Sequence, residues 1–316
     1  MVERLIDGAL DRAVAPGYSR FGLAVRQRLG SWPADPPRMD GKVVLVTGAS
    51  SGLGRAAAAG LARLGADVRV LTRDSDRSAK LGRELAAETG GAVKGVTCDV
   101  SDLGSVRRFT SRFASNEERL DVLVNNAGVM PDERTESADG VELTFATHVL
   151  GPHVLIERLA PLLRSSAPSR VINVSSGGMY AQGLAIDDLE SREGTYRKNA
   201  VYAKTKRAQV ILTAEWARRL EPDGVAVQAM HPGWADTQGV RDSLPGFSKV
   251  TRSIIRNADQ GADTIVWLAA SPEAQHPTGA FWHDRRPRPE HYVPLTRESA
   301  EDRRRLWEAV EELAGR

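Results

Sequence analysis

The sequence has 316 residues, of which 41% are hydrophobic and 27% are charged, so the chain is long enough to bury the core of one large α/β domain. Lys and Arg together number 43 and Asp and Glu 41, and this near-neutral balance gives no reason to expect nucleic acid as a partner. The single cysteine, Cys98, excludes an internal disulfide framework and a cysteine-rich metal site, and no metal ion is expected.

Residues 1–40 are predicted to form an N-terminal arm, partly amphipathic, that ends in the proline-rich stretch 32–37. Charges within its first dozen positions are incompatible with a transmembrane span or a secretory signal, so we expect a cytoplasmic protein. Apolar residues alternate loosely with Arg20, Arg26 and Arg28, which permits docking on the protein's own surface or peripheral contact with anionic lipid of a membrane. Docking is favoured, because three arginines contribute only about 1 kcal/mol each at a charged membrane.

From Lys42 onwards, short β-branched runs alternate with helical segments, a pattern typical of a parallel sheet with helices on both faces. We therefore predict a single doubly wound Rossmann-type α/β domain over residues 41–316, with a central parallel sheet of about seven strands. Segments 177–199 and 238–258 are predicted to be substrate loops. In the second loop, Leu244, Pro245 and Phe247 can line an apolar pocket or simply hold the loop in place, and both interpretations stay open.

The first strand–turn–helix unit contains a glycine-rich turn. The strand 43–46 is followed by glycines at 48, 52 and 54 and then by an alanine-rich helix. Glycines let the backbone approach a pyrophosphate closely and present it to the helix N-terminus, where free amides and the helix dipole favour an anion. The expected cofactor contacts in this turn are Thr47, Gly48, Ser50, Ser51, Gly52, Leu53 and Gly54.

The ends of the next strands are predicted to hold the adenosine half of a dinucleotide. After the strand 67–72 the chain has Arg73 instead of the carboxylate usual in NAD sites, and a guanidinium can pair with a 2′-phosphate, so NADP(H) is favoured over NAD(H). Asp74 keeps NAD open, because a shifted turn would bring its carboxylate to the ribose hydroxyls. Asp99, followed by Val100, is placed to accept a hydrogen bond from an adenine amino group.

A helix is predicted over residues 199–220, because apolar side chains recur there at helical spacing. Tyr202 and Lys206 then lie one turn apart on the same face. A free phenol has a pKa near ~10, and an adjacent ammonium lowers that pKa. Tyr202 is therefore the expected general acid/base, with Lys206 as the group that lowers the pKa of its phenol.

From about residue 41 to the C-terminus, the sequence resembles the short-chain dehydrogenase/reductase family. The matching motifs are Thr47-Gly48 with Gly52 and Gly54, Asn125-Asn126-Ala127-Gly128, Val174-Ser175-Ser176, Tyr202 with Lys206, and Pro232-Gly233 with Thr237. The resemblance implies hydride transfer between a nicotinamide and a carbonyl or alcohol, with Ser176 as the group that holds the substrate oxygen. It also implies that the cofactor is contacted by Asn126, Ala127, Gly128, Tyr202, Lys206, Pro232, Gly233 and Thr237.

One position departs from the pattern of that family. His148 stands where most members carry an asparagine that holds a water in a proton relay from the lysine to solvent. If the imidazole joins the relay, it introduces a group with pKa ~6.5 and a pH dependence near neutrality. Otherwise it packs inside a helix predicted over residues 141–163. Both roles stay open, and His148 is counted with Ser176, Tyr202 and Lys206 as a candidate catalytic residue.

The predicted function is that of an NADP-dependent oxidoreductase for a small, apolar carbonyl or alcohol substrate. The alternative is a cofactor-binding regulator or scaffold of the same fold with little turnover, although such a protein has no need to keep the serine, tyrosine and lysine. A helix over residues 299–313 is expected to pack on the domain or on a second subunit, which leaves a homo-oligomer as an option. His231 is interpreted as a satisfied core group or as a group that supports the residues of the site, and Arg285–Arg288 as a solvated surface.

Overall fold

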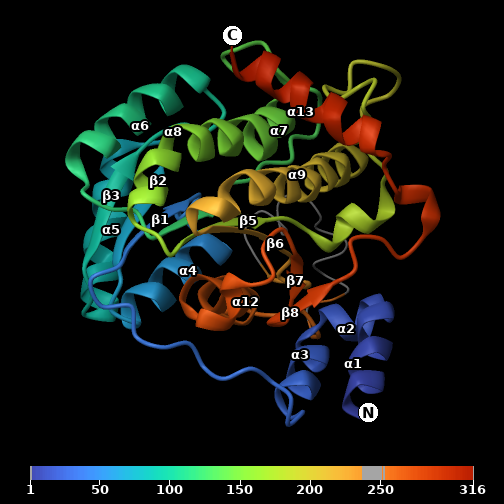
Figure 1. The fold of residues 1–316 in the computed structure, drawn as a ribbon, viewed down its shortest axis with the longest axis horizontal. Coiled ribbons are helices and arrows are strands. Elements are labelled where there is room, and N and C mark those ends of the chain that lie inside the picture. Colours follow the sequence, from blue (N-terminus) through green and yellow to red (C-terminus); the bar gives the residue numbers. More distant parts are fainter. Residues whose placement is uncertain (1, 237–250, 252, 316) are drawn as a thin grey trace.

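The computed structural model describes residues 2–236, 251 and 253–315. Within them, one eight-stranded sheet crosses the molecule in the order β3-β2-β1-β4-β5-β6-β7-β8 (Figure 1). The first seven strands are parallel, and β8 pairs antiparallel with β7. The strands are β1 Val43–Thr47, β2 Asp67–Thr72, β3 Val93–Thr97, β4 Val122–Asn125, β5 Ser169–Val174, β6 Val225–Met230, β7 Phe281–His283 and β8 Arg286–Arg288.

The extra strand β8 has no strand-like pattern, because it consists of Arg-Pro-Arg. A proline is tolerated there, since β8 is an edge strand that pairs only with β7. The prediction that Arg285–Arg288 forms a solvated surface is wrong. Arg285 and Arg288 are both buried, because their guanidinium groups are held in ion pairs with carboxylates.

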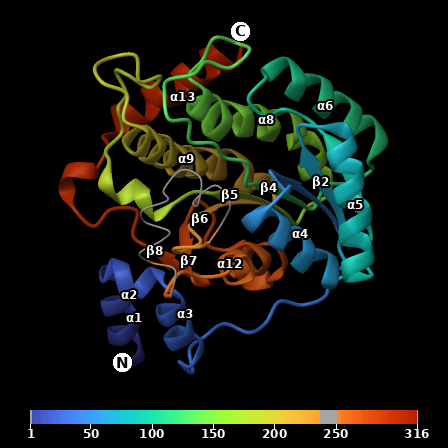
Figure 2. The same cartoon turned by 180° about the vertical axis from the view of Figure 1, so that it is seen from behind.

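Helices cover both faces of the sheet, and the residues of its central strands alternate between two cores. Leu45 of β1 belongs to one core, whereas its neighbours Val44 and Val46 belong to the other. This double burial explains why the central strands are runs of Val, Ile and Leu. One face is covered by α4 Gly52–Arg63, α5 Ser75–Thr89 and α12 Ala258–Ala270, and the other by α6 Leu103–Asn116, α8 Gly151–Ser165 and α9 Lys198–Leu220 (Figures 1 and 2).

The C-terminal helix α13, Ala300–Ala314, packs on its own domain. Its apolar residues Leu306, Val310 and Leu313 are buried in the same core as α8 and α9. The apolar face of this helix therefore packs on the domain, which is one of the two predicted options. A homo-oligomer stays a prediction.

The order of the strands reverses between β1 and β4, since β2 and β3 lie on one side of β1 and the later strands on the other. Connections that leave such a point in opposite directions open a crevice at the carboxyl ends of the strands, which is where doubly wound sheets bind ligands. The predicted fold class is confirmed. The turns that follow β1, β4, β5 and β6 carry most of the candidate site residues, and all of them open at this edge.

Within the described residues, the arm forms the short helices α1 Val2–Arg12, α2 Val14–Tyr18 and α3 Arg20–Gln27, which lie beside β7 and β8 (Figure 2). Its first helix is oriented opposite to a usual amphipathic helix: Asp7 and Asp11 are buried, whereas Val2 and Leu5 are 65% and 67% exposed. The arm thus docks through charged side chains and leaves an apolar face outward. Lipid contact through this face stays a prediction. No helix in the described part of the chain is both long and apolar enough to cross a bilayer.

The two predicted substrate loops differ in how far the structure describes them. The loop 177–199 begins with the 3-10 turn Gly177–Ala181 and then contacts the C-terminal region. The hydroxyl of Tyr180 donates to the carbonyl oxygen of Pro289 at 2.7 Å, and the carboxylate of Asp187 pairs with Arg305 at 2.7 Å. Of the loop 238–258, residues 238–250 and 252 lie outside the described residues, and these include the apolar residues at 244, 245 and 247.

Candidate active site

The glycine-rich turn after β1 is packed against the turn after β4. A β-carbon at Gly48, where φ is +64°, would lie 2.6 Å from the Cα of Ala127, and one at Gly54 would lie 2.4 Å from the Nδ2 of Asn126. The hydroxyl of Thr47 accepts hydrogen bonds from the backbone N–H groups of Asn126 and Ala127, at 3.0 and 3.1 Å. The two turns therefore form one rigid surface, which side chains at positions 48 and 54 would force apart.

The N-terminus of α4 faces outward from this surface and is open to an anion. Ser51 is the N-cap residue, but its side chain caps no amide, and the first turn contains no acidic residue. The N-terminal amides of Gly52, Leu53 and Gly54 have no acceptors within the helix, and the positive end of its dipole adds to their attraction for negative charge. This turn, together with Ser50, fits the pyrophosphate of a dinucleotide.

At the end of β2, Arg73 and Asp74 have different roles. The carboxylate of Asp74 caps α5, because its Oδ1 accepts a hydrogen bond from the backbone N–H of Arg77 at 2.8 Å. Asp74 is thus engaged as a helix cap through this oxygen. Arg73 is exposed and forms no hydrogen bond or ion pair with any described residue. Its guanidinium is therefore available for a 2′-phosphate.

Two further segments contain residues that the sequence predicts to contact the cofactor. After β3, the Oδ1 of Asp99 accepts hydrogen bonds from the backbone N–H and the hydroxyl of Ser101, at 2.9 and 2.7 Å. The carbonyl of Val100 packs against Gly151 at the start of α8, where a β-carbon would lie 2.0 Å from it. Gly128 follows β4 and packs against His148, whose Nε2 would be 3.0 Å from a β-carbon at that position.

The structure brings Ser176, Tyr202 and Lys206 together at the carboxyl end of β5. Ser176 follows that strand by two residues and hydrogen-bonds the phenol of Tyr202 on α9. Lys206 lies one turn further along α9, with its Nζ 5.6 Å from the centre of the tyrosine ring. The helix is held against the strand by Ser175, whose hydroxyl donates to the backbone carbonyl of Lys206 at 2.9 Å.

The electrostatics of this group differ from the sequence prediction. Burial raises the pKa of Tyr202 above that of a free phenol, and the hydrogen bond of Ser176 opposes this shift only in part. The predicted lowering of this pKa is therefore wrong for the ligand-free protein, because burial sets a net shift in the opposite direction. The ammonium of Lys206 is engaged elsewhere, with the carbonyl of Val174 at 2.8 Å and Gln209 at 3.3 Å. Burial lowers the pKa of Lys206 to about 7.

His148 is fully buried in a π-helical segment, Ala146–Leu150, that joins the short helix α7 Leu143–Phe145 to α8. Its Nε2 accepts from the backbone N–H of Val129 at 3.1 Å, so the proton resides on Nδ1, which donates to the hydroxyl of Thr205 at 2.8 Å. Burial, and after it the charge of Lys206, lowers the imidazole pKa well below 6.5. Of the two roles left open for His148, the one with a titration near neutrality is contradicted, because a second proton would break the bond from Val129.

The loop after β6 contains Pro232 and Gly233, and Thr237 at its end lies outside the described residues. Gly233 has φ of +72°, and its backbone N–H donates to the Nδ1 of His231 at 3.3 Å. The interpretation of His231 as a satisfied core group holds for only one nitrogen. Its Nε2 is buried and makes no hydrogen bond with the described residues. This loop is adjacent to the glycine-rich turn, since a β-carbon at Gly261 would touch both Leu53 and Pro232.

Sequence reasoning missed one aromatic residue at this edge. The ring of Tyr18, in the arm, lies 4.6 Å from the ring of His231, and a β-carbon at Gly177 would lie 2.6 Å from its Cε2. Gly177 is the residue directly after Ser176. No local motif marks Tyr18, because its neighbours in the site are distant in sequence.

The comparisons with known proteins agree with this geometry. A family model described as short chain dehydrogenase matches residues 42–245. The chain is 41% identical over 285 residues to dehydrogenase/reductase SDR family member 12 of Bos taurus, with 88% of each chain covered. It is 39% identical over 302 residues to retinol dehydrogenase 14 of Homo sapiens, with 89% of this chain and 88% of that protein covered. Its fold is similar to the crystal structure of an uncharacterized protein from Mycobacterium Paratuberculosis, with 29% identity, a TM-score of 0.71, and coverage of 89% of this chain and 96% of that one.

Proposed function

The chain belongs to the short-chain dehydrogenase/reductase family, and on that premise we propose that it transfers a hydride between NADP(H) and an apolar carbonyl or alcohol substrate. The observation that supports this proposal is the grouping of Ser176, Tyr202 and Lys206 at the open edge of the sheet, beside a glycine-rich turn that fits a pyrophosphate. Retinol, which the name of one relative gives as a substrate, is an apolar alcohol and supports the substrate class.

Each of the three side chains has a distinct task in this proposal. The nicotinamide, when bound, supplies or accepts the hydride. The phenol of Tyr202 gives a proton to the substrate oxygen in reduction and takes it back in oxidation. The hydroxyl of Ser176 donates to the same oxygen and stabilises the negative charge that develops there. The ammonium of Lys206 favours the phenolate that remains after the proton has left.

The cofactor would be held by residues from several turns. The amides of residues 52–54 would bind the pyrophosphate, Arg73 the 2′-phosphate and Asp99 the adenine amino group. The nicotinamide end would lie beside Lys206 and the loop after β6, since hydride transfer requires it to be near Tyr202. The structure supports NADP over NAD because Asp74 is already engaged as a helix cap and Arg73 is exposed.

A screen for turnover tests this proposal. The purified protein would be incubated with NADPH or NADH and a panel of aldehydes and ketones, and with the oxidised cofactors and alcohols, while absorbance reports the cofactor. We expect turnover with NADPH and apolar carbonyls. Tight cofactor binding without turnover on any substrate would instead support the alternative, a regulator or scaffold that has kept the fold.

Arg73→Ala is expected to weaken the binding of NADPH by about 10- to 100-fold and that of NADH by less than about twofold. The reason is that a charge-assisted hydrogen bond to the 2′-phosphate contributes about 1.5–3 kcal/mol, and NADH lacks that phosphate. Titration calorimetry with both cofactors measures the two affinities. Arg83→Ala, an exposed arginine further along α5, is the matched control and should change neither. Equally weakened binding of NADPH and NADH would show that Arg73 does not contact the 2′-phosphate.

The pH dependence of reduction is expected to follow Lys206. Its pKa is lowered to about 7, so its ammonium is present below that pH and is lost above it, and kcat/KM, which reports the free enzyme, should fall on the alkaline side of about pH 7. Lys206→Arg keeps the charge at all these pH values, so the residual activity of this variant should lack the decline.

His148→Asn serves as the control for that profile. In the unmodified protein the imidazole of His148 remains neutral down to well below pH 6.5, so its replacement should leave the alkaline decline in place. A profile that loses this decline in the asparagine variant would assign the titration to His148 and contradict the assignment to Lys206.

A further inference from the structure

The turn between α2 and α3 of the arm contacts the loop after β6 through its backbone. The N–H of Trp234 donates to the carbonyl oxygen of Tyr18 at 2.8 Å, and the N–H of Arg20 donates to the carbonyl oxygen of Ile254 at 2.8 Å. A β-carbon at Gly233 would lie only 2.6 Å from the same Tyr18 oxygen. The arm and the loop are thus in direct contact, with no room for a side chain between them.

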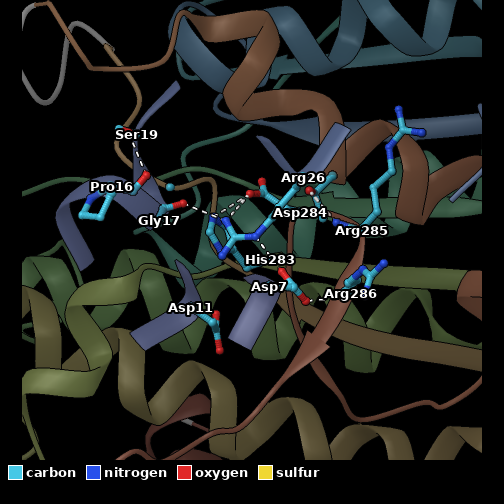
Figure 3. Close-up of polar contacts among 12 residues, drawn as sticks. Asp7, Asp11, Pro16, Gly17, Ser19, Arg26, His283, Asp284, Arg285 and Arg286 are labelled. Atoms are coloured by element: carbon cyan, nitrogen blue, oxygen red, sulfur yellow. Dashed lines mark hydrogen bonds and ion pairs between the residues drawn. The ribbon is translucent and has the colours of Figure 1, made fainter. Parts of the chain in front are cut away.

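A buried ion network holds this contact in place. The side chains of Arg26, Arg256 and Asp284 are each only 1% exposed. Asp284 accepts hydrogen bonds from Arg26 at 2.7 Å (Figure 3) and from Arg256 at 2.6 and 2.9 Å. The same two arginines donate to backbone carbonyls on both sides: Arg26 to Gly17, and Arg256 to Ser19 and Pro232.

A second ion pair fixes the first helix of the arm to the same network. The carboxylate of Asp7 accepts from Arg26 at 2.7 Å (Figure 3) and from Arg288 of β8 at 2.9 Å. Removal of a single partner would leave an uncompensated charge in the interior, so each of these contacts depends on the others. The arm is therefore an integral part of the edge formed by β6, β7 and β8.

The position of this contact places it at one end of the site. Tyr18 lies against Gly177, the neighbour of Ser176, and against the loop at 232–234, whereas Arg73 and Asp99 lie at the far end of the sheet, on the turns after β2 and β3. Since hydride transfer takes place beside Ser176 and Tyr202, the arm borders the reacting end of a bound dinucleotide and not its adenosine end.

We propose that the N-terminal arm is a positioning element of the active site, and that the turn at Tyr18 and Ser19 fixes the loop 232–234 for the nicotinamide half of the cofactor. This inference rests on the proposed function, because it takes a nicotinamide dinucleotide as the ligand. Tyr18 acts through the loop and through Gly177, so it is a positioning residue without a chemical step of its own. Its ring anchors the turn by packing on His231 and His283, with ring centres 4.6 and 5.1 Å away.

The full-length variant Tyr18→Ala tests the inference, with Phe21→Ala on the exposed side of α3 as the control, since Phe21 is 60% exposed. Calorimetry would compare NADPH with 2′,5′-ADP, which carries only the adenosine half. Loosening the loop should weaken NADPH binding by about tenfold or more and leave 2′,5′-ADP within about twofold, because a small misplacement of binding groups affects only the half they contact. KM for NADPH should rise more than kcat falls. The control should change none of these values.

Arg26→Met removes one arginine of the buried ion network and gives a second, independent test. If Tyr18→Ala does not fold, Tyr18→Leu takes its place. Equal weakening of NADPH and 2′,5′-ADP would indicate general destabilisation and would overturn the inference, as would unchanged binding of both ligands. If the unmodified protein binds 2′,5′-ADP and NADPH but neither variant differs from it, only the positioning role fails. If the unmodified protein binds neither ligand, the proposed function fails, and the inference with it.

Discussion

Tyr202→Phe is expected to lower kcat by at least about 100-fold while the affinity for NADPH changes by less than about twofold. General acid catalysis contributes about 10²- to 10⁴-fold, and the substitution removes only the hydroxyl that carries the proton. Ser176 would still hold the substrate oxygen, and Lys206 would keep its contacts with Val174 and Gln209, so the site should remain assembled. Single-turnover reduction measured by cofactor absorbance gives the rate, and calorimetry gives the affinity.

The matched control for this variant is Tyr196→Phe. Tyr196 is also a partly buried tyrosine, but its hydroxyl donates to the carboxylate of Glu142 at 3.1 Å and lies outside the group formed by Ser176, Tyr202 and Lys206. Its loss should leave kcat within a few-fold of the unmodified protein, because this hydroxyl delivers no proton to the substrate. Residual activity of Tyr202→Phe above roughly one hundredth would mean that another group delivers the proton.

Asp284→Asn is expected to lower the free energy of unfolding by about 3–5 kcal/mol. The change removes one charge and little volume, and it leaves Arg26 and Arg256 without their shared counter-ion in the interior. Asparagine also tolerates the backbone at this position, where φ is +52°, so backbone strain adds little. Urea unfolding followed by circular dichroism measures the difference. A loss below about 1 kcal/mol would contradict a structural role for the buried network.

The control for this prediction is a carboxylate on the surface. Asp187 pairs with Arg305 at 2.7 Å, but its side chain is 84% exposed, so Asp187→Asn should cost at most about 1 kcal/mol. Acid provides a second check. Burial alone would raise the pKa of Asp284, but Arg256 and Arg26 hold it below its usual value. The contribution of its charge is therefore present above the unfolded-state pKa of about 3.9 and is lost as the pH falls through the lower folded-state pKa, so the difference between Asp284→Asn and the unmodified protein should shrink in strong acid.

Local patterns were sufficient to predict the parts of the site that depend on local geometry. The glycine-rich turn, the arginine after β2 and the Tyr202–Lys206 pair each follow from a few adjacent residues, and the structure places them at one edge of the sheet. Burial is different, because it depends on the whole fold. The sequence therefore predicted the wrong direction for the pKa of Tyr202, and it left open a titration of His148 that the buried hydrogen bonds of this residue prevent.

The arm shows the same limit on a larger scale. Its alternation of apolar and basic residues was compatible with docking, but the acidic residues that make the contact, Asp7 and Asp11, face inward, and a hydrophobic pattern does not predict an interface made of charges. The partner Arg288 belongs to the segment Arg285–Arg288, which reads as solvated surface when taken alone, and the partner Asp284 directly precedes that segment. Each side of this interface is polar by itself, and only the pairing makes its burial favourable.

The pairing of Arg26 with Asp284 also sets an order of events during synthesis. The two residues are 258 positions apart, so the arm leaves the ribosome long before its counterpart exists. At about 5–20 residues per second, that interval is roughly 10 to 50 s. For this time the acidic side of the first helix lacks its partner Arg288, whereas its apolar side stays exposed as it does in the folded protein. The edge that borders the reacting end of the site is completed last, after the final strands emerge, and a nascent chain that ends before Asp284 is expected to lack a properly formed nicotinamide loop.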